Sequence, residues 1–212
     1  MCGVLAASCN SEIFSKALAA IRHRGPDFQS SFFLENVHLG VTRWAIRGLG
    51  PEGEQPFVCS CGRWTVIYNG EIYNWRELDS EYGLQEESSC DGRIIAPLLC
   101  KLGLDAFSKL RGMFAIIAYD KLKQSFFVTR DHIGIKPLYI SMSENGWAVS
   151  SEIKPLLMLK GGTISPVDMD HYKTFGFLSV KQSGFTNISL IEPGKIIVLD
   201  SQKIICEIGR AH

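Results

Sequence analysis

The sequence predicts an α+β fold in which antiparallel sheets are covered by helices. The first observation is a run of strand-like apolar segments joined by short turns, at 113–119, 126–129, 137–141 and 147–150. Consecutive strands with short connections favour antiparallel pairing. The second observation is helical periodicity in separate blocks, at 74–82, 92–102 and 152–159. These groups indicate sheets stacked face to face with helices outside, although periodicity alone leaves the order of the layers open.

The first third of the chain is predicted to contain a strand, a helix and three more strands. An apolar run at 4–7 indicates the first strand. Asn10 or Ser11 is a suitable helix cap, because either side chain can accept a hydrogen bond from a free backbone N–H. The apolar positions of this helix recur at helical spacing, at Phe14, Leu18 and Ile21. Further strands are expected at 30–34, 38–46 and 64–68.

The C-terminal third begins at a glycine pair, 161–162, which is the one hinge that the sequence indicates. Beyond it, the apolar and β-branched residues at 196–199 predict a strand. The end of the chain should therefore pack on the same domain. With 212 residues, the chain is long enough for one large domain or two small ones.

Composition excludes several classes of function. Lys and Arg total 22 and Asp and Glu total 22, so a strong electrostatic attraction to nucleic acid is not expected. A mean hydropathy of +0.07, without a long uncharged stretch, is not typical of a membrane protein. The seven cysteines include no CxxC pair, and no secretory signal precedes them, which favours a reducing cytoplasm. The CxC formed by Cys59 and Cys61 has no second ligand pair at zinc spacing, so no metal site is expected.

Cys2 is the first candidate for catalysis. Removal of Met1 would leave a thiol and a free α-amine on one residue. An α-amine titrates near ~7.7–8 and a thiol near ~8.5, so at neutral pH the amine can accept the thiol proton. Taken alone, the signal is weak, because cysteine is among the residues most often simply buried. Other motifs have to support it.

Four such motifs follow in order: RHRGPD at 22–27, YNGEIYN at 68–74, RDHIGIKPLY at 130–139 and SSEIK at 150–154. Together with Cys2 they resemble the class II glutamine amidotransferase domain, specifically that of asparagine synthetases. The resemblance implies a four-layer αββα N-terminal nucleophile hydrolase sandwich, with the glutaminase domain at 2–200 and a C-terminal tail at 201–212. It also implies hydrolysis of L-glutamine to glutamate and ammonia through a γ-glutamyl thioester on Cys2.

The resemblance assigns roles to further residues. Arg43 matches the arginine that holds the glutamine α-carboxylate, a task that suits the two parallel donors of a guanidinium. The alternative for Arg43 is a surface salt bridge. The Asn69 side chain and the Gly70 N–H match the donors that stabilise the oxyanion of the tetrahedral intermediates. Without the resemblance, Asn69 and Gly70 would be interpreted as a hairpin turn.

Two carboxylates and a tryptophan complete the implied site. Asp91 matches the carboxylate that holds the substrate α-amine, and Glu71 is expected to assist it. The alternative for Asp91 is a helix N-cap. Trp44 is not assigned by the resemblance; its place beside Arg43 and the glycine-flanked segment at 48–50 make it a candidate gate between the glutaminase pocket and an ammonia exit. The alternative for Trp44 is that its indole packs in the core, where a tryptophan buries a large apolar area.

The sequence departs from the asparagine synthetase pattern at three places. The segment VTRWAIRG at 41–48 looks more like glucosamine-6-phosphate synthase, which leaves the ammonia acceptor open. Cys90 stands where serine is common, and Arg93 replaces the usual glutamate, a change for which the sequence suggests no role. The oligomeric state is also undetermined.

The remaining motif residues are expected to have structural roles. The RHRGPD loop should pack beside Cys2, and His23 in it is interpreted as a hydrogen-bonded structural residue, because the α-amine already supplies a base. Lys136 and Lys154 are interpreted as ion-pair or surface groups.

The chain lacks the SGGxDS-type phosphate loop of the asparagine synthetases and any Walker A pattern. We therefore expect no cofactor in this chain, with ATP and magnesium bound only by a synthetase domain or partner that accepts the ammonia. Two other functions stay open. One is a non-catalytic regulatory or binding module, against which the complete set of site residues argues. The other is an N-terminal nucleophile amidohydrolase for another amide, against which the amino-acid clamp of Arg43 and Asp91 argues.

Overall fold

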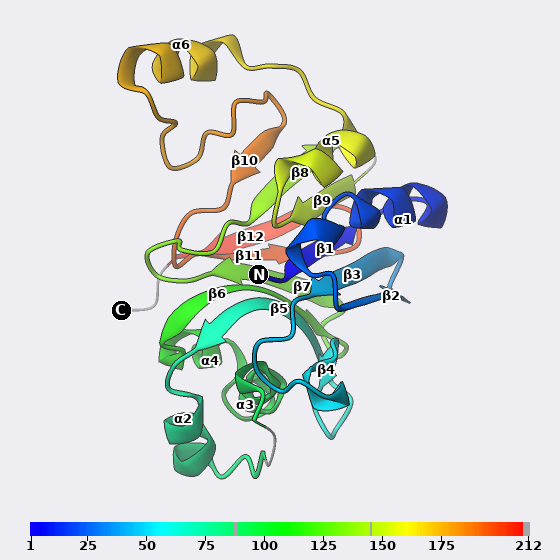
Figure 1. The fold of residues 1–212 in the computed structure, drawn as a ribbon, viewed down its shortest axis with the longest axis vertical. Helices are drawn as coiled ribbons and strands as arrows, with labels where there is room; N and C mark the ends of the chain where they lie inside the picture. The colour runs from blue at the N-terminus through cyan, green and yellow to red at the C-terminus, as the bar shows by residue number, and fades with distance from the viewer. Residues whose placement is uncertain (87–88, 145, 210–212) are drawn as a thin grey trace.

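The computed structural model describes residues 1–86, 89–144 and 146–209. Within them the chain forms two six-stranded sheets whose neighbouring strands are antiparallel (Figure 1). The strand order of sheet A is β10 (Ile188–Leu190), β8 (Tyr139–Ser143), β9 (Gly146–Ser150), β1 (Gly3–Ala7), β3 (Val37–Arg43) and β2 (Phe28–Leu34). The strand order of sheet B is β12 (Ile204–Ile208), β11 (Ile196–Leu199), β7 (Ser125–Arg130), β6 (Gly112–Asp120), β5 (Trp64–Ile72) and β4 (Phe57–Val58).

Helices cover the outer face of each sheet (Figure 1). Sheet A is covered by α1 (Ser11–Ala19) and α5 (Ile153–Lys160), which also contact each other. Sheet B is covered by α2 (Trp75–Tyr82), α3 (Ile95–Leu102) and the short α4 (Ala106–Lys109). The predicted four-layer αββα arrangement is thereby confirmed.

Strand β1 shows why the layers form. Its side chains alternate between two apolar layers, because successive residues of a strand point to opposite faces. Val4 and Ala6 belong to the core between the sheets, whereas Leu5 and Ala7 pack with the α1 residues Phe14, Ala17 and Leu18. A strand buried on both faces has to be apolar at every position, which explains the continuous run GVLAA.

The first helix begins where the sequence predicts. Asn10 is its N-cap, and Oδ1 of Asn10 accepts a 2.8 Å hydrogen bond from the Glu12 N–H. The segment 92–102, predicted as one helix, is divided instead. It starts as a 3₁₀ turn, η3 (Asp91–Ile94), and continues as α3. The tighter turn sets Asp91 against the end of β5 rather than on an α-helical face.

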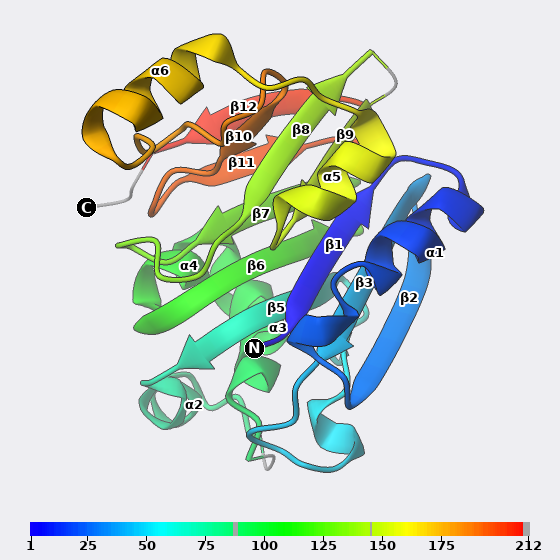
Figure 2. The same ribbon diagram turned by 45° about the horizontal axis from the view of Figure 1, so that its top comes forward.

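Several elements were not predicted. They are β4, α4, α6 (Pro166–Phe175), β10 and β12. Helix α6 has no buried residue and lies at the periphery, away from the two helical layers (Figure 2). Residues 204–208 of the expected tail form β12, which pairs with β11 at the edge of sheet B. None of the helices in the described ranges has the length and apolar character needed to cross a bilayer.

Candidate active site

A cavity of about 160 Å³ lies near the N-terminus, where β1 and β3 of sheet A approach β5 of sheet B (Figure 2). Its wall contains every residue that the sequence analysis placed in the site: Cys2, Arg43, Trp44, Asn69, Gly70, Glu71 and Asp91. These residues come from four separate parts of the sequence, at 2, 43–44, 69–71 and 91. The fold therefore brings the whole predicted set together around one space.

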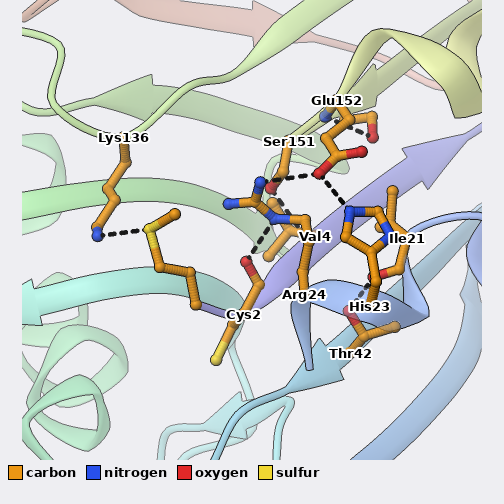
Figure 3. Close-up of polar contacts among 11 residues, drawn as sticks. Cys2, Val4, Ile21, His23, Arg24, Thr42, Lys136, Ser151 and Glu152 are labelled. Carbon is orange, nitrogen blue, oxygen red and sulfur yellow. Dashed lines mark hydrogen bonds and ion pairs between the residues drawn. The ribbon is translucent and has the colours of Figure 1, made fainter. Parts of the chain in front are cut away.

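Cys2 precedes β1 and is held by its backbone. Arg24 Nε donates a 3.1 Å hydrogen bond to the Cys2 carbonyl oxygen, and Arg24 Nη1 donates to Glu152 Oε1 at 2.9 Å (Figure 3). The Cys2 side chain points away from Arg24, and its Sγ lies 3.8 Å from the Trp44 carbonyl oxygen. Because Arg24 contacts the backbone of Cys2 and not its side chain, the side chain can point toward the cavity that Cys2 lines.

The RHRGPD loop packs beside Cys2, as predicted. It contains the 3₁₀ turn η1 (Arg22–Arg24) and the arginine that holds the Cys2 backbone. Gly25 has to be a glycine, because a Cβ there would overlap the backbone of Thr42. His23 is hydrogen-bonded to Glu152, with 2.9 Å between Nε2 and Oε1, which confirms its interpretation as a hydrogen-bonded residue.

Arg43 lies at the end of β3 and is only 6% exposed. Its Nη2 donates to the backbone carbonyl oxygens of Arg47 and Gly48. The surface salt bridge considered for Arg43 is wrong, because the side chain is buried and these partners are carbonyls. The guanidinium thus shapes the loop after β3 while it lines the cavity.

Asn69 and Gly70 lie inside β5, where they pair with Ala115 and Phe114 of β6. The hairpin interpretation is therefore wrong. A Cβ on Gly70 would overlap the Met113 carbonyl oxygen, so the close approach of the two strands requires glycine. Nδ2 of Asn69 is buried and has no hydrogen-bond partner among the described residues. A buried donor without a partner destabilises the fold. A ligand that accepts a hydrogen bond from Nδ2 would remove this cost.

The direction of the Gly70 N–H follows from its neighbours. The Tyr68 N–H donates to Gln55 Oε1 at 2.6 Å. The Ile72 N–H donates to Asp91 Oδ2 at 2.7 Å. Both groups therefore point to the edge of β5 opposite β6, and alternate N–H groups of a strand point to the same edge. The Gly70 N–H lies between them and points the same way, toward the cavity that Gly70 lines.

Asp91 is the first residue of η3, and Cys90 occupies the N-cap position, so the N-cap interpretation of Asp91 is wrong. Its Oδ2 accepts hydrogen bonds from the Tyr68 hydroxyl at 2.6 Å and from the Ile72 N–H. Burial raises the pKa of Asp91 above its ordinary value, although both hydrogen bonds act in the opposite direction. Burial also raises the pKa of Tyr68, so the hydroxyl keeps its proton and remains a donor.

Glu71 and Trp44 are the outer members of the set. Glu71 Oε1 forms a 2.9 Å ion pair with Arg47 Nη2 at the cavity wall. Trp44 is 52% exposed, so the alternative that its indole packs in the core is wrong. Trp44 instead lines the cavity with one part of its surface in solvent.

Sequence reasoning missed Lys136, which was interpreted as a surface or ion-pair group. The side chain is buried and lines the cavity, and its Nζ lies 3.2 Å from Met1 Sδ (Figure 3). Burial, with a smaller contribution from Arg24, lowers the pKa of Lys136. The RDHIGIKPLY motif contains the sequence signal for the position of Lys136. Oδ2 of Asp131 accepts a 2.9 Å hydrogen bond from the Lys136 N–H and thereby fixes the loop.

Arg93, for which the sequence suggested no role, connects two loops behind the site. Its Nε donates to Glu86 Oε1 at 2.9 Å, and its Nη1 donates to the Glu52 carbonyl oxygen at 3.3 Å. Glu52 belongs to the 3₁₀ turn η2 (Pro51–Gly53), whose Gly53 borders Arg43. Arg93 therefore supports the loop that surrounds the Arg43 guanidinium.

Comparison with known proteins gives a consistent result. A putative glutamine-hydrolysing asparagine synthetase of Methanocaldococcus jannaschii is 31% identical over 214 residues, which cover 91% of this chain and 42% of the relative. The glutamine-hydrolysing asparagine synthetase of Gallus gallus is 32% identical over 206 residues, covering 87% of this chain and 35% of the relative. The chain thus spans less than half the length of these relatives.

A solved structure, the glutamine phosphoribosylpyrophosphate amidotransferase of B. subtilis, superimposes with a TM-score of 0.72 at 17% identity. The superposition covers 98% of this chain and 49% of that one, and it confirms the predicted fold. Residues 1–208 match the family described as the glutamine amidotransferase domain. The chain therefore belongs to the class II glutamine amidotransferase domain family.

Proposed function

We propose that this domain hydrolyses L-glutamine to glutamate and ammonia, with Cys2 as the nucleophile. The observation that carries the proposal is the buried Asn69 Nδ2, which has no partner in the described part of the chain and lines the same cavity as Cys2. A second donor, the Gly70 N–H, points to that cavity. Two such donors are what a developing oxyanion requires. The relatives are named as glutamine-hydrolysing enzymes, which supports the same reaction.

The proposed base is the α-amine of Cys2 after removal of Met1. Met1 lines the cavity, so its removal opens this part of the wall and leaves Lys136 Nζ without the sulfur contact. Burial lowers the pKa of the amino terminus at Met1, and the charges of Arg24 and Lys136 act in the same direction. Arg24, which donates to the Cys2 carbonyl oxygen, would also lie close to the α-amine that removal of Met1 leaves on Cys2. A lowered amine pKa suits a base that works near neutral pH.

The substrate is proposed to bind as a zwitterion between two charged groups. The Arg43 guanidinium would pair with the α-carboxylate, and Asp91 would pair with the α-ammonium. Both existing hydrogen bonds of Asp91 use Oδ2, so Oδ1 is the oxygen that a substrate ammonium would meet. Glu71 adds a second negative charge in the same wall.

The reaction then proceeds in two steps. The amine takes the thiol proton, and the thiolate attacks the glutamine carboxamide carbon to give a tetrahedral intermediate. Return of the proton to nitrogen releases ammonia and leaves a γ-glutamyl thioester. Water attacks the thioester, the amine accepts its proton, and the sulfur leaves to regenerate the thiol with glutamate. Asn69 Nδ2 and the Gly70 N–H stabilise the oxyanion in both steps.

We further propose that the ammonia passes to a synthetase domain or partner, which would also hold ATP and magnesium. The chain spans only part of its glutamine-hydrolysing relatives, which supports an acceptor outside these residues. A reducing cytoplasmic environment is proposed from the seven free thiols.

The test is a glutaminase assay on the purified chain, combined with its intact mass. We expect glutamate and ammonia in equal amounts from protein that lacks Met1. Acid quenching during turnover should reveal a γ-glutamyl adduct on the peptide that begins with Cys2. Cys2→Ala should keep the fold and lose both the adduct and the turnover. Turnover at the wild-type rate by Cys2→Ala would place the chemistry elsewhere.

A further inference from the structure

Three cysteines gather outside the active site. Cys59 and Cys61 lie in the turn between β4 and β5, and Cys100 lies in the last turn of α3. The Sγ atoms of Cys61 and Cys100 are 2.8 Å apart, those of Cys59 and Cys61 are 3.3 Å apart, and all three lie within 4.8 Å of one another. None of them lines the active-site cavity. The glutaminase chemistry therefore does not account for this cluster.

Backbone contacts hold Cys59 in the β4–β5 turn. The Trp64 N–H donates to Cys59 Sγ at 3.1 Å, and the Gly62 N–H donates to the Cys59 carbonyl oxygen at 2.8 Å. Gly62 has a φ of +69°, which this turn requires and which glycine adopts freely. An N–H donor directed at sulfur stabilises a thiolate more than a neutral thiol. The Trp64 N–H would therefore stabilise a thiolate at Cys59.

We propose that Cys59, Cys61 and Cys100 bind one Zn²⁺ ion as thiolates. Zinc prefers tetrahedral sites with Zn–S bonds of ~2.3 Å, which separate the sulfurs by about 3.8 Å. Both short distances in the cluster involve Cys61, which is exposed, whereas Cys59 is buried. Movement of the exposed Cys61 side chain would lengthen both short distances toward the spacing that zinc requires.

The fourth ligand is a water molecule or another small solvent donor. Among the described residues, no further Cys, His, Asp or Glu joins the group. The exposure of Cys61 places the open position toward solvent. Binding converts three thiols to thiolates, so the three protons are released to the buffer.

Zinc accounts for the cluster better than a disulfide does. A disulfide would join two of the sulfur atoms and leave the third unused. Zinc would bind all three, and the Trp64 N–H would still donate to Cys59 Sγ. The ion would connect the β4–β5 turn to the C-terminal end of α3, and α3 continues directly from η3, which holds Asp91. The site would thus fix the helix whose preceding turn contributes to the cavity.

The binding test uses the reduced, metal-free chain in a Cys2→Ala background, because the Cys2 thiol and a free amine could also bind zinc. Competition with a chromophoric chelator should give one Zn²⁺ per chain. Cys59→Ser and Cys100→Ser should each weaken binding by at least about 100-fold, since even a change behind the ligands costs ~10–100-fold. Cys206→Ser, which changes an exposed cysteine in β12, is the matched control and should bind normally.

A second measurement needs no variant within the cluster. Zinc should protect Cys59, Cys61 and Cys100 of the same Cys2→Ala chain from alkylation, while Cys206 stays reactive. The melting temperature should rise with zinc concentration, because the ion binds the folded chain. Absence of zinc binding by the reduced chain, or equal affinity in Cys59→Ser and Cys206→Ser, would overturn the proposal.

Discussion

The hydroxyl of Tyr68 donates a 2.6 Å hydrogen bond to Oδ2 of Asp91, which joins the middle of β5 to the turn that precedes α3. The same oxygen accepts the Ile72 N–H. One oxygen of the carboxylate therefore has a structural role, and the other can serve a substrate. The two roles that the sequence offered as alternatives can be separated experimentally, because they use different atoms.

Asp91→Asn is expected to keep the fold and weaken glutamine binding. The carboxamide oxygen can accept both existing hydrogen bonds, while the NH₂ group replaces Oδ1. Loss of a charge-assisted pair of roughly 1.5–3 kcal/mol should raise KM by about 10- to 100-fold. Steady-state kinetics and the melting temperature measure the two effects. Asp170→Asn, on exposed α6, is the control. An unchanged KM in Asp91→Asn would remove Asp91 from substrate binding.

The raised pKa of Asp91 also predicts a pH dependence. The native state holds this proton more tightly than the unfolded chain does, so the contribution to stability is present below the unfolded pKa and is lost as pH rises through the folded pKa. Substrate binding needs the ionised form, so kcat/KM should decline as pH falls through the raised pKa. A pH profile of kcat/KM should show this limb in the wild type. If the decline of kcat/KM at low pH remained in Asp91→Asn, another group would be its cause.

Retention of Met1 should abolish turnover. An N-terminal extension converts the proposed base into an amide and fills part of the cavity that Met1 lines. Chain with a processed N-terminus and chain with a blocked, Met1-bearing N-terminus should be compared at equal concentration, each verified by intact mass. The processed form should be active. Full activity in chain that retains Met1 would exclude the α-amine as the base.

Arg43→Lys should raise KM although the charge is retained. An ammonium cannot offer the planar pair of donors to a carboxylate, and it also cannot reproduce the contacts of Arg43 with the carbonyls of Arg47 and Gly48. We expect kcat/KM to fall by about 10- to 100-fold, the equivalent of roughly 1.5–3 kcal/mol. Lys154→Arg, at an exposed position, controls for a change of cation. Wild-type kinetics in Arg43→Lys would show that Arg43 does not bind the substrate and only supports the loop after β3.

Trp44→Ala should alter the reaction more than the stability. The indole is half exposed, so its truncation is expected to cost about 1 kcal/mol or less, well below the ~3–5 kcal/mol of a core tryptophan. If Trp44 is a gate, glutamate production should change, or ammonia should escape from an assembled synthetase. Thermal unfolding and the ratio of ammonia to final product measure this. A large fall in melting temperature with unchanged specific activity would contradict the gate.

The elements whose signal is local could be predicted from the sequence. The apolar run of β1, the Asn10 cap and the spacing of Phe14 and Leu18 depend on periods of two or about four residues, which can be counted along the chain. The sequence also identified seven of the residues that line the cavity, although it missed Lys136. These patterns need no knowledge of which segments meet in space.

Features that depend on the pairing of distant segments could not be predicted and became visible in the fold. Asn69 and Gly70 resemble a turn until β6 pairs with β5 and places them inside a sheet. Lys136 resembles a surface residue in the sequence, but in the fold its side chain lies against the N-terminus, where Nζ contacts Met1 Sδ. Cys100 lies 39 residues from Cys61 in the sequence, yet its sulfur lies 2.8 Å away once α3 covers sheet B. Burial and sulfur contacts arise when the layers pack against one another. Local periodicity does not predict which segments pack together.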